Sequence, residues 1–416
     1  MHIVFNEEHY LDNAKTPIDL KQEPADIVIL SFSDSDLTAF ASAWKKTRSD
    51  YGENLPSLRL ANIKDLTHNL SVDTYIENTI ADSKCVLVRL IGGEQYWPYG
   101  LNYLKSISLE KNIALAIIPA DGREDKVLDS YSNLPKATLD SIKKLCDNGG
   151  QVSAQAVLAQ LSMAASLYFP PVVNFQKLPS HGYYCDKDGI TETFKKSGKD
   201  KPLVCLIFYK SYLAADDLDP VNRILKSIKR SGTSAIGIFV NSLKNKNLAS
   251  WLISELQVLK PISIINGTAF SAKDAKTLKS PLDYTECPVF QVIFSTSKKI
   301  GWQKNPLGLN TSDLAMHVAL PEVDGRIDGG IVSFKSENKI DKDLQFSITS
   351  HKAEKHLIKK TIKKVINWNN LSMNSNSEKT VAIILSSYPG REYQLAHAIG
   401  LDTVKSTEKL VNFLCK

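Results

Sequence analysis

The stretch Asp26–Leu37, DIVILSFSDSDL, decides the fold class of this 416-residue chain. Asp26–Ser31 is a largely apolar run rich in isoleucine and valine, typical of a strand that is buried on both faces. The residues Asp34-Ser-Asp36 then open a helix that we expect to reach about Lys46, because hydroxyl and carboxylate side chains can accept hydrogen bonds from the free N–H groups of a first turn. A buried strand followed directly by a helix predicts a βαβ unit and a parallel sheet.

The same alternation continues along the chain. Further strands are expected at Leu58–Ala61, Lys84–Ile91 and Ile113–Ile118. A mostly helical stretch, about Thr138–Phe169, and a polar loop, about Leu178–Lys201, come next. The alternation then restarts, with strands expected at Pro202–Tyr209, Ala235–Val240, Ile262–Ile265 and Val289–Phe294. The predicted fold class is therefore α/β, with successive Rossmann- or flavodoxin-like parallel sheets that carry helices on both faces.

Four regions follow from this pattern. We expect a first α/β domain at residues 1–137, a helical segment and linker at 138–201, a second α/β domain at 202–330, and at 331–416 a strand pair, a lysine-rich helix and the first βα unit of a further region. The strands of the last region are expected at Ile331–Lys335, Gln345–Ser350 and Thr380–Ser386, and its last helix at about Ser406–Leu414. A single βα unit cannot bury both faces of its strand. It either docks on an earlier sheet or opens a truncated domain, and we favour truncation.

The charge of the chain is concentrated in one helix. Lys+Arg total 51 and Asp+Glu 45, a net charge of +6, and the segment His351–Trp368 holds six lysines against Glu354 alone. Its apolar residues fall at helical spacing, so the lysines occupy the opposite face. A solvated helix face is the main interpretation, and a docking face for an acidic partner is the alternative. Without interleaved aromatic residues, no nucleic-acid partner is expected.

Targeting and metal signals are weak. The first ten residues carry acidic side chains where a secretory signal would be basic, and no apolar run approaches the roughly 20 residues that span a bilayer. The six cysteines include no C-x-x-C pair, so no zinc site is expected. We expect a cytoplasmic protein that has no membrane partner.

Standard catalytic motifs are absent from the sequence. It contains no G-x-x-x-x-G-K-[ST], no G-x-G-x-x-G after a strand, no G-x-S-x-G and no H-E-x-x-H. We therefore expect no ATP binding through a Walker loop and assign no catalytic residue. Candidate ligand residues come instead from loops at strand ends, where open α/β sheets bind their ligands.

The first two candidate loops follow predicted strands. Asp34 and Asp36 could face a ligand or cation, or they could serve only to start a helix. The loop Val88–Gly100, VRLIGGEQYWPYG, could form a stacking platform with Tyr96 and Trp97, with Arg89 and Glu94 as polar anchors. The alternative is that these aromatic side chains pack in the core.

Two further candidates are less specific. His68 is a weak candidate for metal ligation, since a lone loop histidine more often makes a hydrogen bond. Glu322, Asp324 and Arg326 could line a site or form a surface ion pair. Only eight of the 51 basic residues are arginines, which favours a role for Arg89 and Arg326 that needs a planar guanidinium.

Taken together, these segments resemble the large subunit of aerobic cobaltochelatase (CobN) and its relative, the magnesium chelatase H subunit. The matching stretches, in the family's order, are PADIVILSFSDSDL, LPSLRLANI, HNLSVDTYIENT, VRLIGGEQYWPYGL, NGTAFSA, SPLD, GLNTSDLAMHVALPEVDGRI and GLDTVKS. The YWPYG and LPE-x-DGR-I elements favour the cobalt branch. The family's large subunit extends beyond 416 residues, which fits the truncation expected above.

The resemblance implies ATP-dependent insertion of Co²⁺, the substrate metal, into hydrogenobyrinic acid a,c-diamide during cobalamin biosynthesis. It also implies that the large subunit holds the corrinoid while AAA+ ATPase partners use ATP and Mg²⁺. This chain alone is then expected to be inactive. The alternatives are a non-catalytic α/β module that binds a tetrapyrrole or a partner, a magnesium chelatase H-like subunit, and an unrelated α/β enzyme for a small polar ligand.

Overall fold

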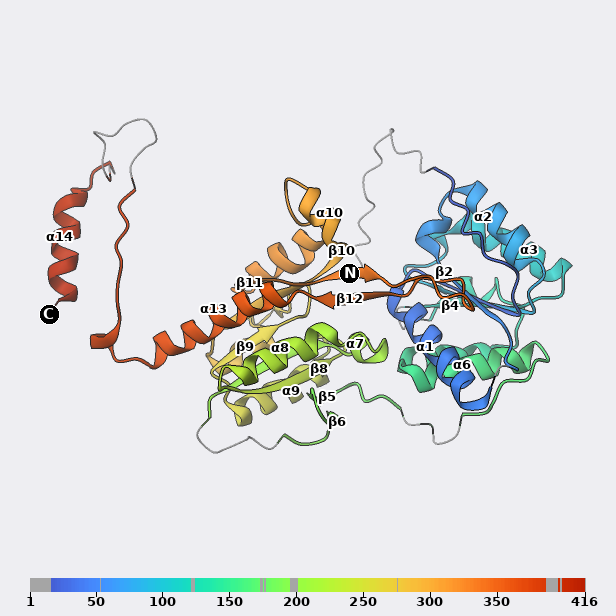
Figure 1. Ribbon diagram of the computed structural model, residues 1–416, viewed down its shortest axis with the longest axis horizontal. Helices are drawn as coiled ribbons and strands as arrows, with labels where there is room; N and C mark the ends of the chain where they lie inside the picture. Colours follow the sequence, from blue (N-terminus) through green and yellow to red (C-terminus); the bar gives the residue numbers. More distant parts are fainter. Residues whose placement is uncertain are drawn as a thin grey trace. The chain divides into compact units, whose positions relative to one another are not determined.

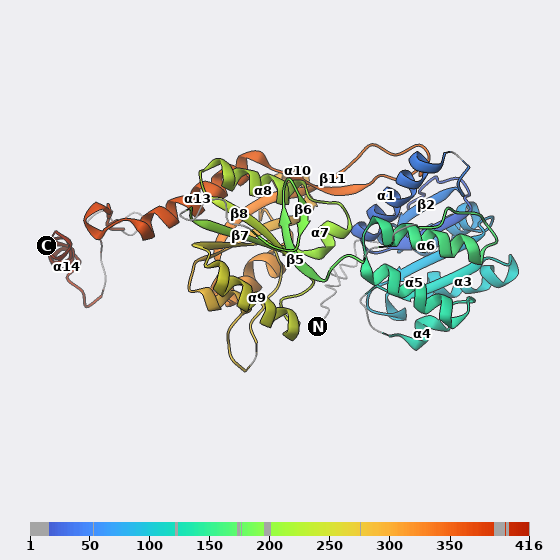
Figure 2. The same ribbon diagram turned by 90° about the horizontal axis from the view of Figure 1, so that it is seen from below.

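The computed structural model describes residues 16–52, 54–120, 124–172, 175, 177–194, 201–274, 276–386, 396 and 399–415 (Figure 1). The chain divides into two units, residues 1–366 and 367–416. The first unit contains two sheets, each with helices on both faces, which confirms the α/β fold class (Figure 2).

The first sheet is fully parallel, with strand order β2-β1-β3-β4. Its strands are β1 (Ile27–Ser31), β2 (Leu58–Asn62), β3 (Cys85–Leu90) and β4 (Ala114–Pro119). Its helices are α1 (Asp34–Tyr51), α2 (Asn69–Tyr75, continued by wider turns to Ile80), α3 (Pro98–Glu110), α4 (Lys126–Asp129), α5 (Lys136–Asn148) and α6 (Gln151–Ala164). One face packs on α1, α5 and α6 and the other on α2 and α3, so the strands are apolar on both sides.

The second sheet has strand order β12-β11-β10-β9-β7-β8-β5-β6. Its central strands are parallel, and β5, β6 and β12 are antiparallel to their neighbours. The strands are β5 (His181–Cys185), β6 (Gly189–Thr191), β7 (Leu203–Tyr209), β8 (Ser234–Val240), β9 (Ser263–Asn266), β10 (Val289–Lys298), β11 (Ile327–Glu337) and β12 (Thr349–Ala353). The helices α8 (Asp219–Arg230) and α13 (Lys355–Met373) contribute to the core on one face, and α9 (Lys246–Leu259) to the core on the other. The short helices α7 (Lys210–Ala214), α10 (Lys299–Lys304), α11 (Thr311–Asp313) and α12 (Leu320–Val323) lie in its connections.

Two expectations about the second sheet need correction. The segment expected as a polar loop, about Leu178–Lys201, contains the β5–β6 hairpin, which pairs antiparallel with the edge of β8. The strand pair expected after residue 330 exists, but it belongs to this sheet, since β11 pairs in parallel with β10. The lysine-rich helix packs there too, with Ile358 and Ile362 in the core.

The β11–β12 connection ties the second sheet to the first. Leu344 is fully buried in the core beneath α1, with Phe346 against it. Arg59 Nη1 donates to the carbonyl oxygen of Asp343 at 2.8 Å, and Gln22 Nε2 donates to that of Gln345 at 2.9 Å. These contacts fix the two lobes of the first unit against each other.

The second unit holds the end of α13 and α14 (Thr403–Leu414). The strand expected over Thr380–Ser386 is not formed. Its residues are irregular, and Val381 and Ile384 are 62% and 90% exposed. A strand needs a neighbour for its backbone groups, and the described part of this unit contains no strand. Within the described residues, no helix has both the length and the apolar character that crossing a membrane requires.

Candidate functional site

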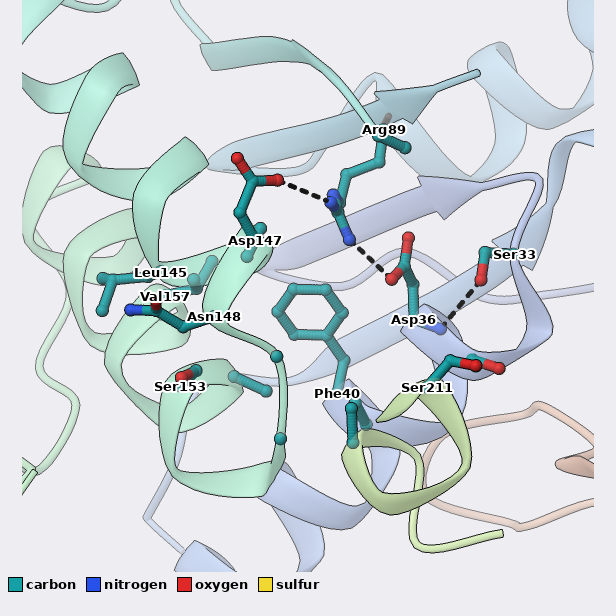
Figure 3. Close-up of a pocket in the computed structure, with 18 of the residues that line it drawn as sticks. Ser33, Asp36, Phe40, Arg89, Leu145, Asp147, Asn148, Ser153, Val157 and Ser211 are labelled. Carbon is teal, nitrogen blue, oxygen red and sulfur yellow. Dashed lines mark hydrogen bonds and ion pairs between the residues drawn. The ribbon is translucent and has the colours of Figure 1, made fainter. Parts of the chain in front are cut away.

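A cleft of about 650 Å³ lies at the carboxyl edge of the first sheet (Figure 3). One wall is formed by residues that follow β1 and β3, among them Asp36 and Arg89. The α5–α6 connection contributes Asp147 and Gly150, and the second lobe contributes α7, beginning at Lys210. The carboxyl ends of parallel strands meet at one edge, which explains why residues distant in sequence converge here.

Arg89 lies between two carboxylates in this cleft. Its Nη1 lies 2.5 Å from Asp36 Oδ1, and its Nη2 lies 3.6 Å from Asp147 Oδ1 (Figure 3). The residue is only 5% exposed, and its Nε has no hydrogen-bond partner among the described residues. Burial opposes its charge, but Cys146, Asp36 and Asp147 outweigh that effect and raise the pKa of Arg89. The guanidinium is therefore a fixed cation in the wall of the cleft.

The two acidic residues of α1 serve different places. Asp36 accepts a hydrogen bond from Ser31 Oγ at 3.0 Å, and its backbone N–H donates to the capping Ser33 Oγ at 3.3 Å. Asp34 instead accepts from Asn62 Nδ2 at 2.9 Å and pairs with Lys335 at 3.5 Å. The helix cap is confirmed, and only Asp36 reaches the cleft beside Arg89.

The aromatic loop does not form a stacking platform with Trp97. That side chain is 4% exposed, packs in the core with α2 and α3, and donates from Nε1 to the carbonyl oxygen of Leu66 at 2.8 Å. Tyr96 covers Gly92, a glycine at φ 88° where a Cβ atom would collide with the tyrosine ring. Glu94 accepts a hydrogen bond from Tyr131 Oη at 2.5 Å. All three candidates lie away from the cleft.

The candidates Asp324 and Arg326 form a buried brace. Asp324 accepts from Ser271 Oγ at 2.5 Å and from the backbone N–H of Ala272 at 2.7 Å. Arg326 Nη1 donates to Asp283 Oδ1 at 2.7 Å. An ion pair was one of the two readings of this element, and the structure shows it as buried. Glu322 is exposed.

His68 caps a helix. Its Nδ1 accepts a hydrogen bond from the backbone N–H of Leu70 at 3.1 Å, at the start of α2. Across the parts of the chain that the structure describes, no three His, Cys, Asp or Glu side chains come together as a metal site. These residues therefore offer no resident metal centre that would include His68.

Sequence reasoning missed two charged residues of the cleft. Asp147 approaches Arg89 only through the packing of the α5–α6 connection, for which the sequence carries no signal. Lys210 does carry one, because it directly follows the strand β7, and the strand-end rule applied to Asp36 and Arg89 would have selected it.

Comparison with known proteins gives a consistent family. The CobN/magnesium chelatase family matches residues 144–416. An aerobic cobaltochelatase subunit CobN from Sinorhizobium is 30% identical over all of this chain and 33% of its own length, and one from Pseudomonas aeruginosa is 30% identical over 92% of this chain and 31% of its own. A chloroplastic magnesium-chelatase subunit ChlH from Oryza sativa is 22% identical over 53% of this chain and 16% of its own.

A solved structure supports the fold. The catalytic subunit of cobaltochelatase from Mycobacterium tuberculosis matches 93% of this chain and 30% of that chain, with a TM-score of 0.59 and 21% identity. Proteins with this architecture and these relatives are chelatase subunits of the CobN/magnesium chelatase type. The chain belongs to the CobN/magnesium chelatase family. It spans about a third of the length of the cobaltochelatase relatives that it matches.

Proposed function

We propose that this chain is the N-terminal part of the large subunit of a cobaltochelatase. The complete enzyme would be a ligase that forms nitrogen–metal bonds, inserting Co²⁺, as substrate, into hydrogenobyrinic acid a,c-diamide on the route to cobalamin. The identity of 30% to two CobN subunits, against 22% to a magnesium-chelatase subunit, supports the cobalt branch.

The division of labour within such a complex follows from what the chain carries. Its 416 residues contain no Walker loop, which fits a subunit whose AAA+ partners bind ATP and Mg²⁺. Its described residues bring together no set of metal ligands, so metal insertion would need groups from outside them. We therefore propose that the chain alone is inactive. Its six free cysteines suit the reducing cytoplasm.

The observation that carries the proposed site is the buried pair of Arg89 and Asp36 in the cleft between the two lobes. Apolar side chains, among them Phe40 and Val157, line the same cleft. A corrinoid is a largely apolar macrocycle with a rim of carboxylate and carboxamide groups, and it suits such a mixed surface. We propose that part of the corrinoid binds here, with the Arg89–Asp36 pair facing its polar rim.

Two alternatives remain attached to specific observations. The lack of a described catalytic constellation favours a tetrapyrrole-binding module without chemistry of its own. The similarity to ChlH favours a magnesium chelatase H-like subunit, although at lower identity.

Deletion of the gene in its host tests the proposed function. Cobalt insertion should stop and metal-free hydrogenobyrinic acid a,c-diamide should accumulate, whereas magnesium porphyrins should be unaffected. The wild-type gene and Arg223→Met, which alters a half-exposed arginine of α8, should restore insertion, and Arg89→Met should not. Normal cobalamin production in the deletion strain would contradict the proposal, and loss of magnesium insertion would favour the magnesium branch.

A further inference from the structure

Lys210 is a buried cation without a carboxylate partner. The residue is 7% exposed, and its Nζ donates to one neutral group, the carbonyl oxygen of Leu178, at 3.1 Å. Among the residues that the structure describes, no aspartate or glutamate forms an ion pair with it. Burial and the neighbouring Lys177 lower its pKa, and no carboxylate acts against them. An isolated buried ammonium is unfavourable, and proteins normally give it a counter-charge.

The carboxylates of the cleft do not supply that counter-charge. Asp36 and Asp147 both face Arg89, with contacts of 2.5 and 3.6 Å. Lys210 lies on the wall contributed by the second lobe, at the start of α7. The cleft therefore has one side where a cation is matched by two carboxylates and another where a cation has none.

The amino terminus of α6 borders the same cleft. Gly149 and Gly150 have φ angles of 70° and 90° and lead into this 14-residue helix. Its cap, Gly150, makes no side-chain hydrogen bond, and the first turn carries no acidic residue. The free backbone N–H groups of such a terminus attract anions. Ser153 from the first turn also lines the cleft (Figure 3).

We propose that this side of the cleft is an anion-binding site, in which Lys210 and the amino terminus of α6 bind a carboxylate or phosphate group. The anion chemistry stands on these two features alone. That the anion is a peripheral carboxylate of the corrinoid rests on the proposed function. A bound anion would supply the charge that Lys210 lacks and would join a group of the second lobe to a helix of the first.

Thermal unfolding at constant ionic strength tests the anion site. Sodium phosphate or sodium glutarate, compared with sodium chloride, should raise the midpoint of the wild-type chain by about 2–4 °C at roughly ten times the dissociation constant. Lys210→Met should lose this rise. Lys226→Met, which removes an exposed lysine of α8, should keep it. No anion-specific rise in the wild type, or an equal rise in Lys210→Met, would overturn the proposal.

A second variant covers the case in which Lys210→Met does not fold. Ser211→Asp keeps Lys210 and adds a carboxylate beside it in the cleft wall. It should raise the midpoint in chloride and abolish the response to added anions, and an unchanged response would overturn the proposal.

Two corrinoid arms separate the sources of the anion. Hydrogenobyrinic acid a,c-diamide should bind more weakly by a factor of ten or more when its remaining carboxylates are converted to amides. If phosphate stabilises the chain through Lys210 but neither corrinoid binds, the anion site stands and the proposed function fails. If both corrinoids bind equally and no anion responds to Lys210→Met, the proposed function stands and the anion site fails.

Discussion

Asp36, in the first turn of α1, and Arg89, at the end of β3, form an ion pair of 2.5 Å at the carboxyl edge of the first sheet. The Arg89 side chain is 6% exposed and that of Asp36 is 20% exposed, so the pair lies largely out of water. In such surroundings, removing one partner leaves the other charge without compensation.

Asp36→Asn should therefore lower the free energy of unfolding by about 3 kcal/mol, the lower end of what breaking a buried pair costs. Asp147 stays near Arg89 and limits the loss. Urea denaturation measures the change. Asp50→Asn, which breaks an exposed pair with Lys46 on the same helix, is the matched control and should change stability by less than about 0.5 kcal/mol. Equal losses in the two variants would show that burial of the Arg89 pair has no energetic consequence.

Trp97→Phe tests whether the aromatic loop belongs to the core or to the ligand site. Because the indole fills the core between α2 and α3 and satisfies the carbonyl of Leu66, its loss should cost about 1–3 kcal/mol of stability. Corrinoid affinity should not change. Trp368→Phe, at a half-exposed position, should be nearly neutral in both measurements. A large loss of affinity without a loss of stability would restore the stacking platform.

The β11–β12 connection should act as a fastener between the lobes. Leu344→Ala removes a fully buried side chain from the core beneath α1 and should cost about 2–5 kcal/mol, whereas Ile340→Ala, 70% exposed on the same connection, should cost little. Anion binding at Lys210 should weaken in Leu344→Ala, because the two walls of the cleft come from different lobes. Unchanged anion binding in a destabilised variant would show that other contacts hold the lobes.

The stability of the chain should depend on His351 below neutral pH. His351 is buried against Tyr212 and Phe294, and burial, together with Lys335 and His317, holds its pKa well below the usual value. The unfolded chain then binds the proton more readily, so stability is lost as the pH falls below about 6.5, by up to about 1.4 kcal/mol per pH unit.

His351→Gln should flatten this dependence, which thermal unfolding between pH 7.5 and 5 measures. Two other buried groups contribute in both proteins and are removed by the comparison. Burial also lowers the pKa of His317, and burial raises the pKa of Asp217 to about 6, which gains stability as the pH falls. His356→Gln is the control, because His356 is exposed. Parallel curves for wild type and His351→Gln would contradict the prediction.

The sequence predicted the parts of the structure that depend on local pattern. Apolar runs such as Val86–Val88 gave the parallel strands, and the strand-end rule selected Asp36 and Arg89. The same rule failed where packing decides. Trp97 has the composition of a binding loop but turns into the core. Thr380–Ser386 has the composition of a strand, but the described part of its unit offers no strand to pair with it.

Other features have no local signal. The β5–β6 hairpin consists of short, mixed segments that become strands by pairing with the edge of β8. Asp147 reaches Arg89 through the packing of α5 and α6 against α1, and the cleft exists only because α7 of the second lobe faces the first. Contacts of this kind depend on tertiary structure rather than on spacing along the chain.

Calorimetric titration of hydrogenobyrinic acid a,c-diamide into the purified chain is the most direct measurement of its role, with protoporphyrin IX titrated in parallel. The corrinoid should bind with micromolar affinity, and at least tenfold more tightly than the porphyrin. The folded double variant Asp36→Asn/Arg89→Met, which removes the pair without leaving an unmatched charge on either residue, should lose that binding. Absence of corrinoid binding, or undiminished binding in the double variant, would contradict the placement of the corrinoid in this cleft.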